Sequence, residues 1–230
     1  MLSWLRSFLP LRLQQKLLRQ HGKNNALQHY LHVPIPSLQA DIAGLEFLVL
    51  DLETTGLDAS RDNIISIGYT IVRNNKVVLN NNTYSVISQS DQLQHDNVSI
   101  HKITDSMAQQ GNDLKPVLDK LLTDLAGKVL VAHHASIEKT FLNAACRHYY
   151  GCDLPVRVVD TMAIEKKRLL RRHVSIKTNQ LRLFNIRKSA GLPRYKAHNA
   201  LEDAIAAAEL LLLQIAHVCG QHRCRLKDLL

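Results

Sequence analysis

The chain has 230 residues, of which 46% are hydrophobic and 5% aromatic, enough apolar material for one full-sized domain with an aliphatic core. Its 29 Lys and Arg outnumber its 20 Asp and Glu, and a formal net charge of +9 favours polyanionic partners. No apolar run is long enough to span a membrane, and Arg6, Pro10 and Arg12 interrupt any secretory signal core. The totals therefore argue against a membrane-spanning or secreted protein, and we expect a cytoplasmic one.

The chain begins with a basic, apolar segment. Leucines recur at helical spacing at positions 2, 5, 9, 13 and 17, and residues 1–40 hold five basic side chains and no acid. The predicted helix could lie at a membrane interface, bind a partner protein or fold back onto the main domain. A polar stretch with Gly22, Pro34 and Pro36 follows, and we expect it to separate this helix from the domain.

Strands and helices then alternate along the chain. An apolar strand is expected at about 45–52, and residues 63–87 predict a hairpin around an Asn-Asn turn. The later expected elements are helices at 99–111 and 113–127, a strand at 128–133, a helix at 135–151, a strand at 156–160 and a last helix at 199–220. This order predicts an α/β fold with a mixed central sheet flanked by helices and an N-terminal helical extension. The expected divisions are an extension at 1–43, a main domain at 44–218 and a tail at 219–230.

Four cysteines occur in the chain, and without a secretory signal we expect all of them to be reduced thiols. They are Cys146, Cys152, Cys219 and Cys224. The last two lie in "HVCGQHRC" beside two histidines, which are metal-ligand residue types, but their spacing fits no tetrahedral zinc pattern. A frayed helix end is the expected structure there.

The stretch "FLVLDLETTGLD" ends a buried strand with Asp51 and Glu53. Side chains at i and i+2 of a strand share a face, so two like charges meet there and repel unless a cation or a proton lies between them. A solvated pair at a strand end is the alternative. In α/β sheets, sites gather at strand ends, where loops converge.

Two further segments carry acids near helix starts. "VAHHASIEKTFL" places Glu138 in the first turn of a helix, and "KAHNALEDA" places His198 and Asp203 five residues apart. That spacing is about 140° on an ideal helix, so the two share a face only if His198 lies on the preceding loop. Each segment alone is explained by helix capping or by interaction with the helix dipole.

In this order, "DLETTGLD", "HHASIEKTFL" and "HNALEDA" resemble the three signature motifs of the DEDDh 3′→5′ exonucleases, which are DnaQ-like and include polymerase III epsilon-type proofreading enzymes. The resemblance covers about residues 45–217. "SIHKITDSM" is similar to the His-Gly-Ile-Thr stretch of that family, with Lys102 where glycine is common. The resemblance implies an RNase H-like fold and a metal-dependent enzyme that removes nucleotides from a 3′ end, with single-stranded DNA the expected substrate.

The resemblance also implies a mechanism with two divalent ions, Mg²⁺ or Mn²⁺, held by carboxylate oxygens. Asp51 would bridge both ions, Glu53 and Asp203 would complete the ion that binds the attacking water, and His198 would act as general base. Glu138 stands where the family normally has Asp, so the fourth metal ligand has a longer arm and the second ion could be weakened. Asp160 is the rival for that position, although capping of the next helix explains it.

Contacts with the terminal nucleotide follow from the same resemblance. The expected residues are Thr54, Gly56, Leu57, Ile100, His101 and Ile137. Leu57 would wedge against the base, His101 would reach the sugar or base, and Ile137 replaces a common aromatic residue. Core packing is the alternative for Leu57 and Ile137.

Residues 166–201 contain eleven Lys and Arg and no acid, so they could follow a nucleic-acid backbone or form a solvated basic surface. Two other functions remain open: trimming of RNA 3′ ends, and an accessory subunit that binds nucleic acid after its chemistry has weakened. DNA is the favoured nucleic acid, and the N-terminal helix could bind a protein partner.

Overall fold

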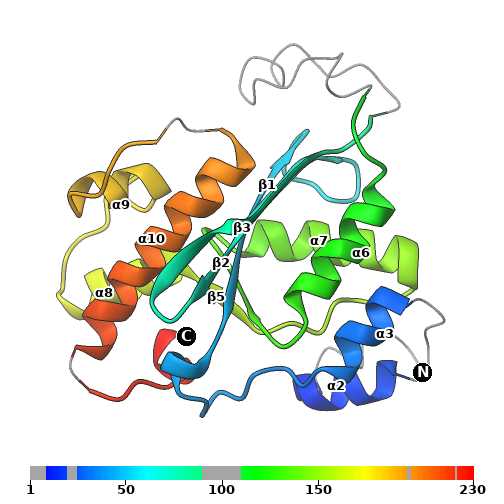
Figure 1. Cartoon of the computed structure of the whole chain (residues 1–230). Coiled ribbons are helices and arrows are strands. Elements are labelled where there is room, and N and C mark those ends of the chain that lie inside the picture. The colour runs from blue at the N-terminus through cyan, green and yellow to red at the C-terminus, as the bar shows by residue number, and fades with distance from the viewer. Residues whose placement is uncertain (1–8, 20–24, 90–109, 196–197, 221) are drawn as a thin grey trace.

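The computed structural model describes residues 9–19, 25–89, 110–195, 198–220 and 222–230 (Figure 1). A five-stranded sheet in the order β3-β2-β1-β4-β5 forms its centre. Strand β1 (Phe47–Thr54) lies in the middle, antiparallel to β2 (Ile64–Arg73) and parallel to β4 (Val129–Ala132). Strand β3 (Lys76–Val86) pairs with β2, and β5 (Val158–Asp160) pairs with β4. The predicted mixed sheet is confirmed.

The hairpin between β2 and β3 turns at Asn74 and Asn75, whose φ angles are 52° and 57°. Two consecutive residues with positive φ are typical of a type I′ turn, whose twist matches that of the flanking strands. Asparagine tolerates this conformation better than most residues, which is why the Asn-Asn pair predicts the turn correctly.

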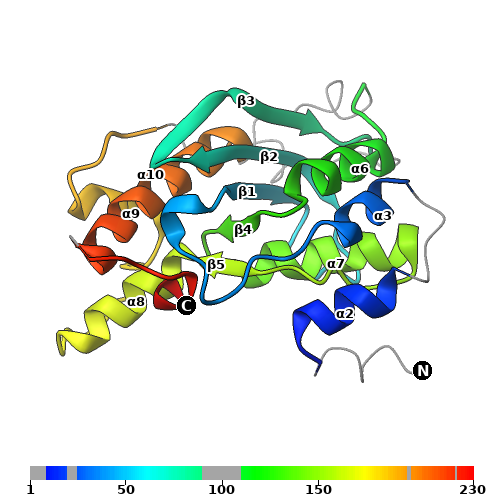
Figure 2. The ribbon, with the colours of Figure 1, turned by 60° about the horizontal axis from the view of Figure 1, so that its bottom comes forward.

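Helices cover both faces of the sheet (Figure 2). On one side lie α2 (Leu11–Leu18), α3 (Asn25–His32), α6 (Leu114–Leu125) and α7 (Ser136–Tyr150). On the other lie α8 (Thr161–Arg171), α9 (Leu183–Ser189) and α10 (Ala200–Cys219). Each side has its own apolar core. Because strand side chains alternate, Leu48 and Leu50 enter the first core, whereas Phe47 and Val49 enter the second.

The sequence prediction of a linker after the first helix is wrong for residues 25–32, which form α3. Leu27, Tyr30 and Leu31 are spaced for one helical face and are buried in the first core. The Tyr30 hydroxyl donates a hydrogen bond of 2.8 Å to the Pro155 carbonyl, and Gln15 of α2 donates one of 2.6 Å to the Val33 carbonyl. Both helices therefore pack against the sheet domain, while residues 1–8 lie outside the described part.

The prediction of four reduced thiols is also wrong for one pair, because Cys219 and Cys224 form a disulfide. Helix α10 ends at Cys219, and the chain turns back so that the two Cα atoms lie 5.3 Å apart, inside the range a disulfide requires. The segment after α10, expected to be a frayed helix end, is therefore a turn closed by a disulfide. Cys146 and Cys152 remain thiols and are buried. Two short 3₁₀ helices, η1 (Ile42–Gly44) and η2 (Leu226–Leu229), contribute Ile42, Leu226 and Leu229 to the second core, where the disulfide cysteines also pack. Among the described residues, none of the helices combines the length and hydrophobicity needed to span a membrane.

Candidate active site

Three carboxylates meet where the C-terminal end of β1 faces the first turn of α10. Asp51, Glu53 and Asp203 each place one oxygen within 4.8 Å of the other two. Asp51 and Glu53 alternate with Leu50 and Leu52, so they lie on the sheet face that α10 covers. Glu53 is only 7% exposed. The predicted meeting of these carboxylates at a strand end is what the structure shows.

Two residues position the start of α10 against the sheet. The Asn199 side chain accepts hydrogen bonds of 3.1 Å from the backbone N–H groups of Leu201 and Glu202, which caps the helix. Gly68 of β2 pairs in register with Asp51, and a Cβ at position 68 would lie 2.2 Å from the Ala200 carbonyl carbon. Only glycine therefore allows α10 to approach β2 closely enough to bring Asp203 to Asp51. Neither residue was predicted from the sequence, although a lone glycine within an apolar strand is a recognised sign of close approach.

His198 lies on the loop before α10, as the spacing argument required. Its φ angle is 70°, and its backbone N–H donates a hydrogen bond of 3.1 Å to Oδ2 of Asp203. Its side chain is exposed. The second oxygen of Asp203, Oδ1, is buried and accepts no hydrogen bond from any residue that the structure describes. One oxygen of Asp203 thus holds the His198 backbone, and the other has no hydrogen-bond donor among the described residues.

Glu138, in the first turn of α7, is not one of the three clustered carboxylates. It is 4% exposed, and its Oε2 accepts no hydrogen bond from the described residues. Burial, more than any other cause, raises its pKa to about 8, and the negative charge of Asp160 contributes. After burial and the charge of Asp203, the charge of Glu138 is a further cause that raises the pKa of Asp51.

Asp160 has a structural role. Its carboxylate accepts hydrogen bonds from the backbone N–H groups of His134 and Ala135 before α7, and from Met162 and Ala163 at the start of α8. These bonds hold the ends of β4 and β5 and the starts of two helices in place. The rival assignment of Asp160 as the fourth ligand therefore competes with a role that already occupies both of its oxygens.

The electrostatics of the cluster fit a divalent cation. Burial, followed by the charges of Asp203, Glu138 and Glu53, raises the pKa of Asp51 well above its ordinary value. Burial is also the main cause that raises the pKa of Asp203 to about 7. Such a site stays charged at neutral pH only if positive charge offsets the repulsion. Carboxylate oxygens are the ligands that hard divalent cations prefer, so the residues present suit such an ion.

A model of an exonuclease family, RNase T, matches residues 48–211, which include all three carboxylates and His198. The chain belongs to this family. It is 34% identical over 182 residues to the DNA polymerase III subunit epsilon of Treponema pallidum, covering 76% of this chain and 79% of that protein. It is 30% identical over 176 residues to the PolC-type DNA polymerase III of Thermotoga petrophila, covering 76% of this chain. The matched segment spans only 12% of that longer polymerase.

Solved exonucleases share the fold of this family member. The nuclease domain of 3′hExo, a DEDDh family member bound to rAMP, superposes with a TM-score of 0.64 at 15% identity and covers 81% of this chain and 99% of that one. Exonuclease X in complex with 5′ overhanging duplex DNA has a TM-score of 0.59 at 22% identity, covering 80% and 98%. The predicted family and RNase H-like α/β fold are confirmed.

In this exonuclease domain, the loop after β1 presents Leu57 to solvent with 78% of its surface exposed. Leu57 is therefore not a core-packing residue, which was the alternative explanation for a leucine at this position. The Thr54 hydroxyl donates a hydrogen bond of 2.6 Å to the Gly56 carbonyl, and Asp62 accepts from the Asp58 backbone N–H at 2.8 Å. Asp62 was not predicted from the sequence, and its hydrogen bonds hold this loop in shape.

Of the remaining residues predicted to contact the substrate, the structure describes only Ile137. Ile137 is half-buried and packs against the first core, which fits its alternative explanation as a packing residue. Ile100 and His101 lie outside the described residues, as does the helix expected at 99–111 except for its last two residues, which are not helical.

Proposed function

We propose that the protein is a metal-dependent 3′→5′ exonuclease that hydrolyses phosphodiester bonds at the 3′ end of nucleic acid, with single-stranded DNA as its substrate. The observation that carries this proposal is the buried cluster of Asp51, Glu53 and Asp203 next to the loop of His198. Membership of an exonuclease family supports it, as does the net positive charge of the chain.

Asp51, Glu53 and Asp203 would hold two divalent cations, Mg²⁺ or Mn²⁺. When bound, such ions supply positive charge opposite the phosphate and favour deprotonation of an attacking water. The three carboxylates would hold and orient the ions, and the cover of α10 over this end of β1 keeps the carboxylates largely out of water. Glu138, which lies outside this group of three, would add a fourth acid.

His198 would accept the proton from the attacking water, because an imidazole can take up a proton near neutral pH. The bond from its backbone N–H to Asp203 sets the position of the residue. At the substrate end, Leu57 would contact the terminal base and the Thr54–Gly56 turn would contact the nucleotide. Ile100, His101 and Ile137 would complete the pocket.

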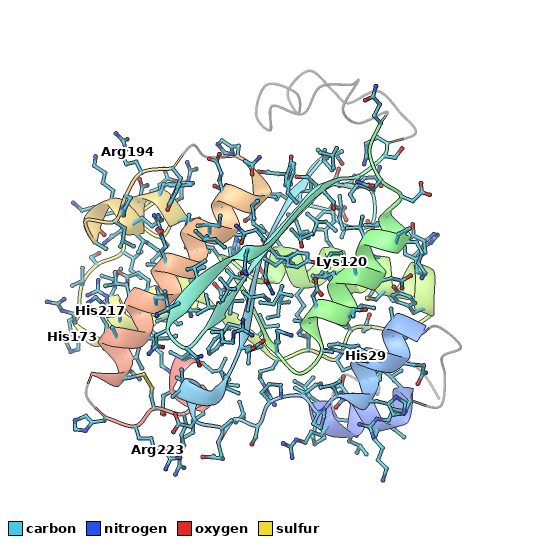
Figure 3. The ribbon with its side chains drawn as sticks, in the orientation of Figure 1. His29, Lys120, His173, Arg194, His217 and Arg223 are labelled. Carbon is cyan, nitrogen blue, oxygen red and sulfur yellow. A yellow bond between two sulfur atoms is a disulfide. The ribbon has the colours of Figure 1, made fainter. Side chains whose placement is uncertain are left out.

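A basic surface next to α10 would guide the strand. Among the described residues from the end of α8 to the start of α10, six basic side chains are exposed: Arg171, Arg172, Lys177, Arg182, Lys188 and Arg194. Figure 3 shows Arg194, His173 and His217 on this side of the molecule. Phosphate contacts from such residues are independent of sequence and weaken with salt. Arg187 is excluded, since it is 1% exposed and pairs with Glu209 at 2.7 Å.

The test uses three 5′-labelled substrates: single-stranded DNA, a duplex with a recessed 3′ end, and an RNA of the same sequence. Each is incubated with Mg²⁺, with Mn²⁺ and with chelator, and the products are separated on a gel. We expect a metal-dependent ladder shortening from the 3′ end, fastest on single-stranded DNA.

The Asp203→Ala variant should lower the rate at least about 100-fold, because it removes one clustered carboxylate. The matched control is Glu202→Gln, which changes the neighbouring acid on the same turn and should keep most of the activity. Absence of shortening with either metal, in protein that still binds the oligonucleotides, would reject the enzyme and favour an accessory nucleic-acid-binding role. If the RNA were shortened faster than the DNA, the proposed function would instead be trimming of RNA 3′ ends.

A further inference from the structure

The C-terminal tail, residues 222–230, is attached to residues 38–42, the segment that leads into η1 and β1. Asp41 and Arg225 form an isolated antiparallel bridge. Three backbone hydrogen bonds of 2.9–3.0 Å join the two segments: Ile42 N–H to the Cys224 carbonyl, Leu226 N–H to the Ala40 carbonyl and Lys227 N–H to the Leu38 carbonyl. The tail is therefore fixed beside the entry of β1 by one antiparallel bridge, after which it forms η2.

The Cys219–Cys224 disulfide joins this tail covalently to the end of α10. Strand β1 carries Asp51 and Glu53 at its far end, and α10 carries Asp203 in its first turn. The disulfide and the tail thus connect the end of α10 to the start of β1. The carboxylate cluster lies at the other end of both elements. Opening the disulfide would leave α10 and the entry of β1 linked here by non-covalent contacts alone.

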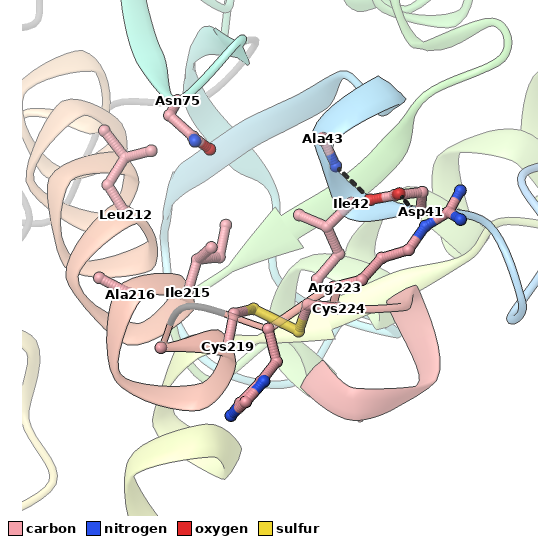
Figure 4. Close-up of a pocket in the computed structure, with 12 residues that line it drawn as sticks. Asp41, Ile42, Ala43, Asn75, Leu212, Ile215, Ala216, Cys219, Arg223 and Cys224 are labelled. Carbon is pink, nitrogen blue, oxygen red and sulfur yellow. Dashed lines mark hydrogen bonds and ion pairs between the residues drawn. A yellow bond between two sulfur atoms is a disulfide. The ribbon is translucent and has the colours of Figure 1, made fainter.

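A pocket of about 580 Å³ gives access to the disulfide (Figure 4). Both cysteines line it, together with Leu212, Ile215 and Ala216 of α10. Across the pocket, Arg223 forms an ion pair of 2.6 Å with Asp41, whose carboxylate also accepts a hydrogen bond from the Ala43 N–H. The opening has room for a small thiol, and Cys219 is the half-exposed member of the pair, since Cys224 is only 8% exposed. Cys146 and Cys152 are buried in the first core.

We propose that the Cys219–Cys224 disulfide is a reversible redox modification site. Its reactant is a small thiol that enters the pocket, and its reduction loosens the tail from residues 38–42. The exonuclease proposal is not required for this inference.

The chemistry is thiol–disulfide exchange. A thiolate of the small thiol attacks one sulfur of the pair, forms a mixed disulfide and releases the other cysteine as a thiolate, which takes a proton from water. A second molecule of the thiol resolves the mixed disulfide. The products are two protein thiols and the oxidised dimer of the small thiol, so two electrons pass from the thiol to the protein.

The test equilibrates the folded full-length chain in buffers that range from reduced to oxidised glutathione. Thiols are trapped with an alkylating agent and assigned by mass spectrometry of peptides. We expect the peptides of Cys219 and Cys224 to convert together with one midpoint, while Cys146 and Cys152 stay unalkylated until the protein is denatured. Reduction should lower the melting temperature by roughly 4 to 8 °C, since it removes a short closed loop from the unfolded chain.

Amide exchange supplies the readout that separates loosening of the tail from a uniform loss of stability. Exchange should accelerate at residues 38–42 and 222–230 on reduction, with little change in β4. The Cys219→Ser/Cys224→Ser variant should match the reduced protein in every buffer, and a Cys146→Ala/Cys152→Ala variant should keep the midpoint. Two results would overturn the proposal: a pair that stays in one state across the whole series, or a pair that converts while exchange at 38–42 is unchanged.

Discussion

Asp203 uses its two oxygens for different purposes. Oδ2 accepts the His198 N–H, and Oδ1 is buried with no hydrogen-bond donor among the described residues. A buried carboxylate oxygen without a donor costs free energy unless a cation or a proton occupies the position. The geometry of this one residue therefore links the position of the proposed base to the binding of the proposed metal. A change at Asp203 should disturb both, which is why a neighbouring acid serves as its control.

Buried acids of this kind make the stability of the metal-free protein depend on pH. Burial raises the pKa of Glu138 from 4.5 to about 8 and that of Asp203 from 3.8 to about 7. The folded state thus binds these protons more tightly than the unfolded state does, so the free energy of unfolding falls as the pH rises. We expect the fall to begin near the ordinary values of these acids and to level off above about pH 8.

The measurement is thermal unfolding from pH 5 to 9, with chelator and with Mn²⁺. Without metal, the Glu138→Gln variant should be more stable than the wild type at pH 8, because an amide cannot acquire the buried charge. Metal should raise the melting temperature more at pH 8 than at pH 5.5, since protons compete with the cation for the same oxygens. A metal effect that is equal at both pH values would contradict this electrostatic account.

At the scale of elements, the site depends on how α10 meets the sheet. Gly68 lies opposite Asp51 in the β1–β2 pair, and the backbone of Ala200 and Leu201 occupies the space where a Cβ would be. Contacts this short involve backbone atoms, so the helix itself would have to move. The distance between Asp203 and Asp51 is therefore set by a residue that carries no chemistry.

The Gly68→Ala variant should push the start of α10 away from β2 and separate the carboxylates. We expect destabilisation of about 1–3 kcal/mol in urea unfolding, and at least a tenfold loss of exonuclease rate at a temperature where the variant is fully folded. The matched control is Gly44→Ala in η1, where an added Cβ meets nothing within 4 Å. A stable Gly68→Ala variant with full activity would show that α10 is not positioned by this contact.

At the scale of the whole molecule, the N-terminal segment is part of the folded domain. Helix α3 packs against α6, and Leu31 is fully buried in the first core. The family match begins only at residue 48, so this cover over one face of the sheet lies outside it. Binding of a protein partner by the N-terminal helix predicted over residues 1–20 stays a proposal beside this packing role.

Leu31→Ala should therefore lower the free energy of unfolding by about 3 kcal/mol, as expected for a cavity in a close-packed core. Leu13→Ala in α2 is the matched control, because Leu13 is 41% exposed and should change stability by less than about 0.5 kcal/mol. Chemical denaturation of both variants measures the difference. Equal stabilities would show that the N-terminal helices contribute little to the domain.

Much of this structure was predictable from local patterns. The apolar strand ending in Asp51 and Glu53, the Asn74–Asn75 turn and the glycine-terminated helix ending at Tyr150 each follow from periodicity or turn chemistry. Helix α3 was missed because its eight residues include polar and histidine side chains, and its apolar face is recognisable only from the core that receives it. The disulfide was missed because compartment arguments say nothing about which cysteines a helix end brings together.

From the sequence alone, the family, the order of most of the elements and the residue types of the candidate site could be predicted, because motifs and alternation are properties of neighbours along the chain. The tertiary structure decided what depends on distance: that Asp203 reaches Asp51, that Glu138 remains outside the group of three carboxylates, and that Asp160 is occupied by backbone N–H groups. Burial raises the pKa values of the acids only after the chain has packed around them. Long-range packing sets those distances and that burial, and no local pattern encodes them.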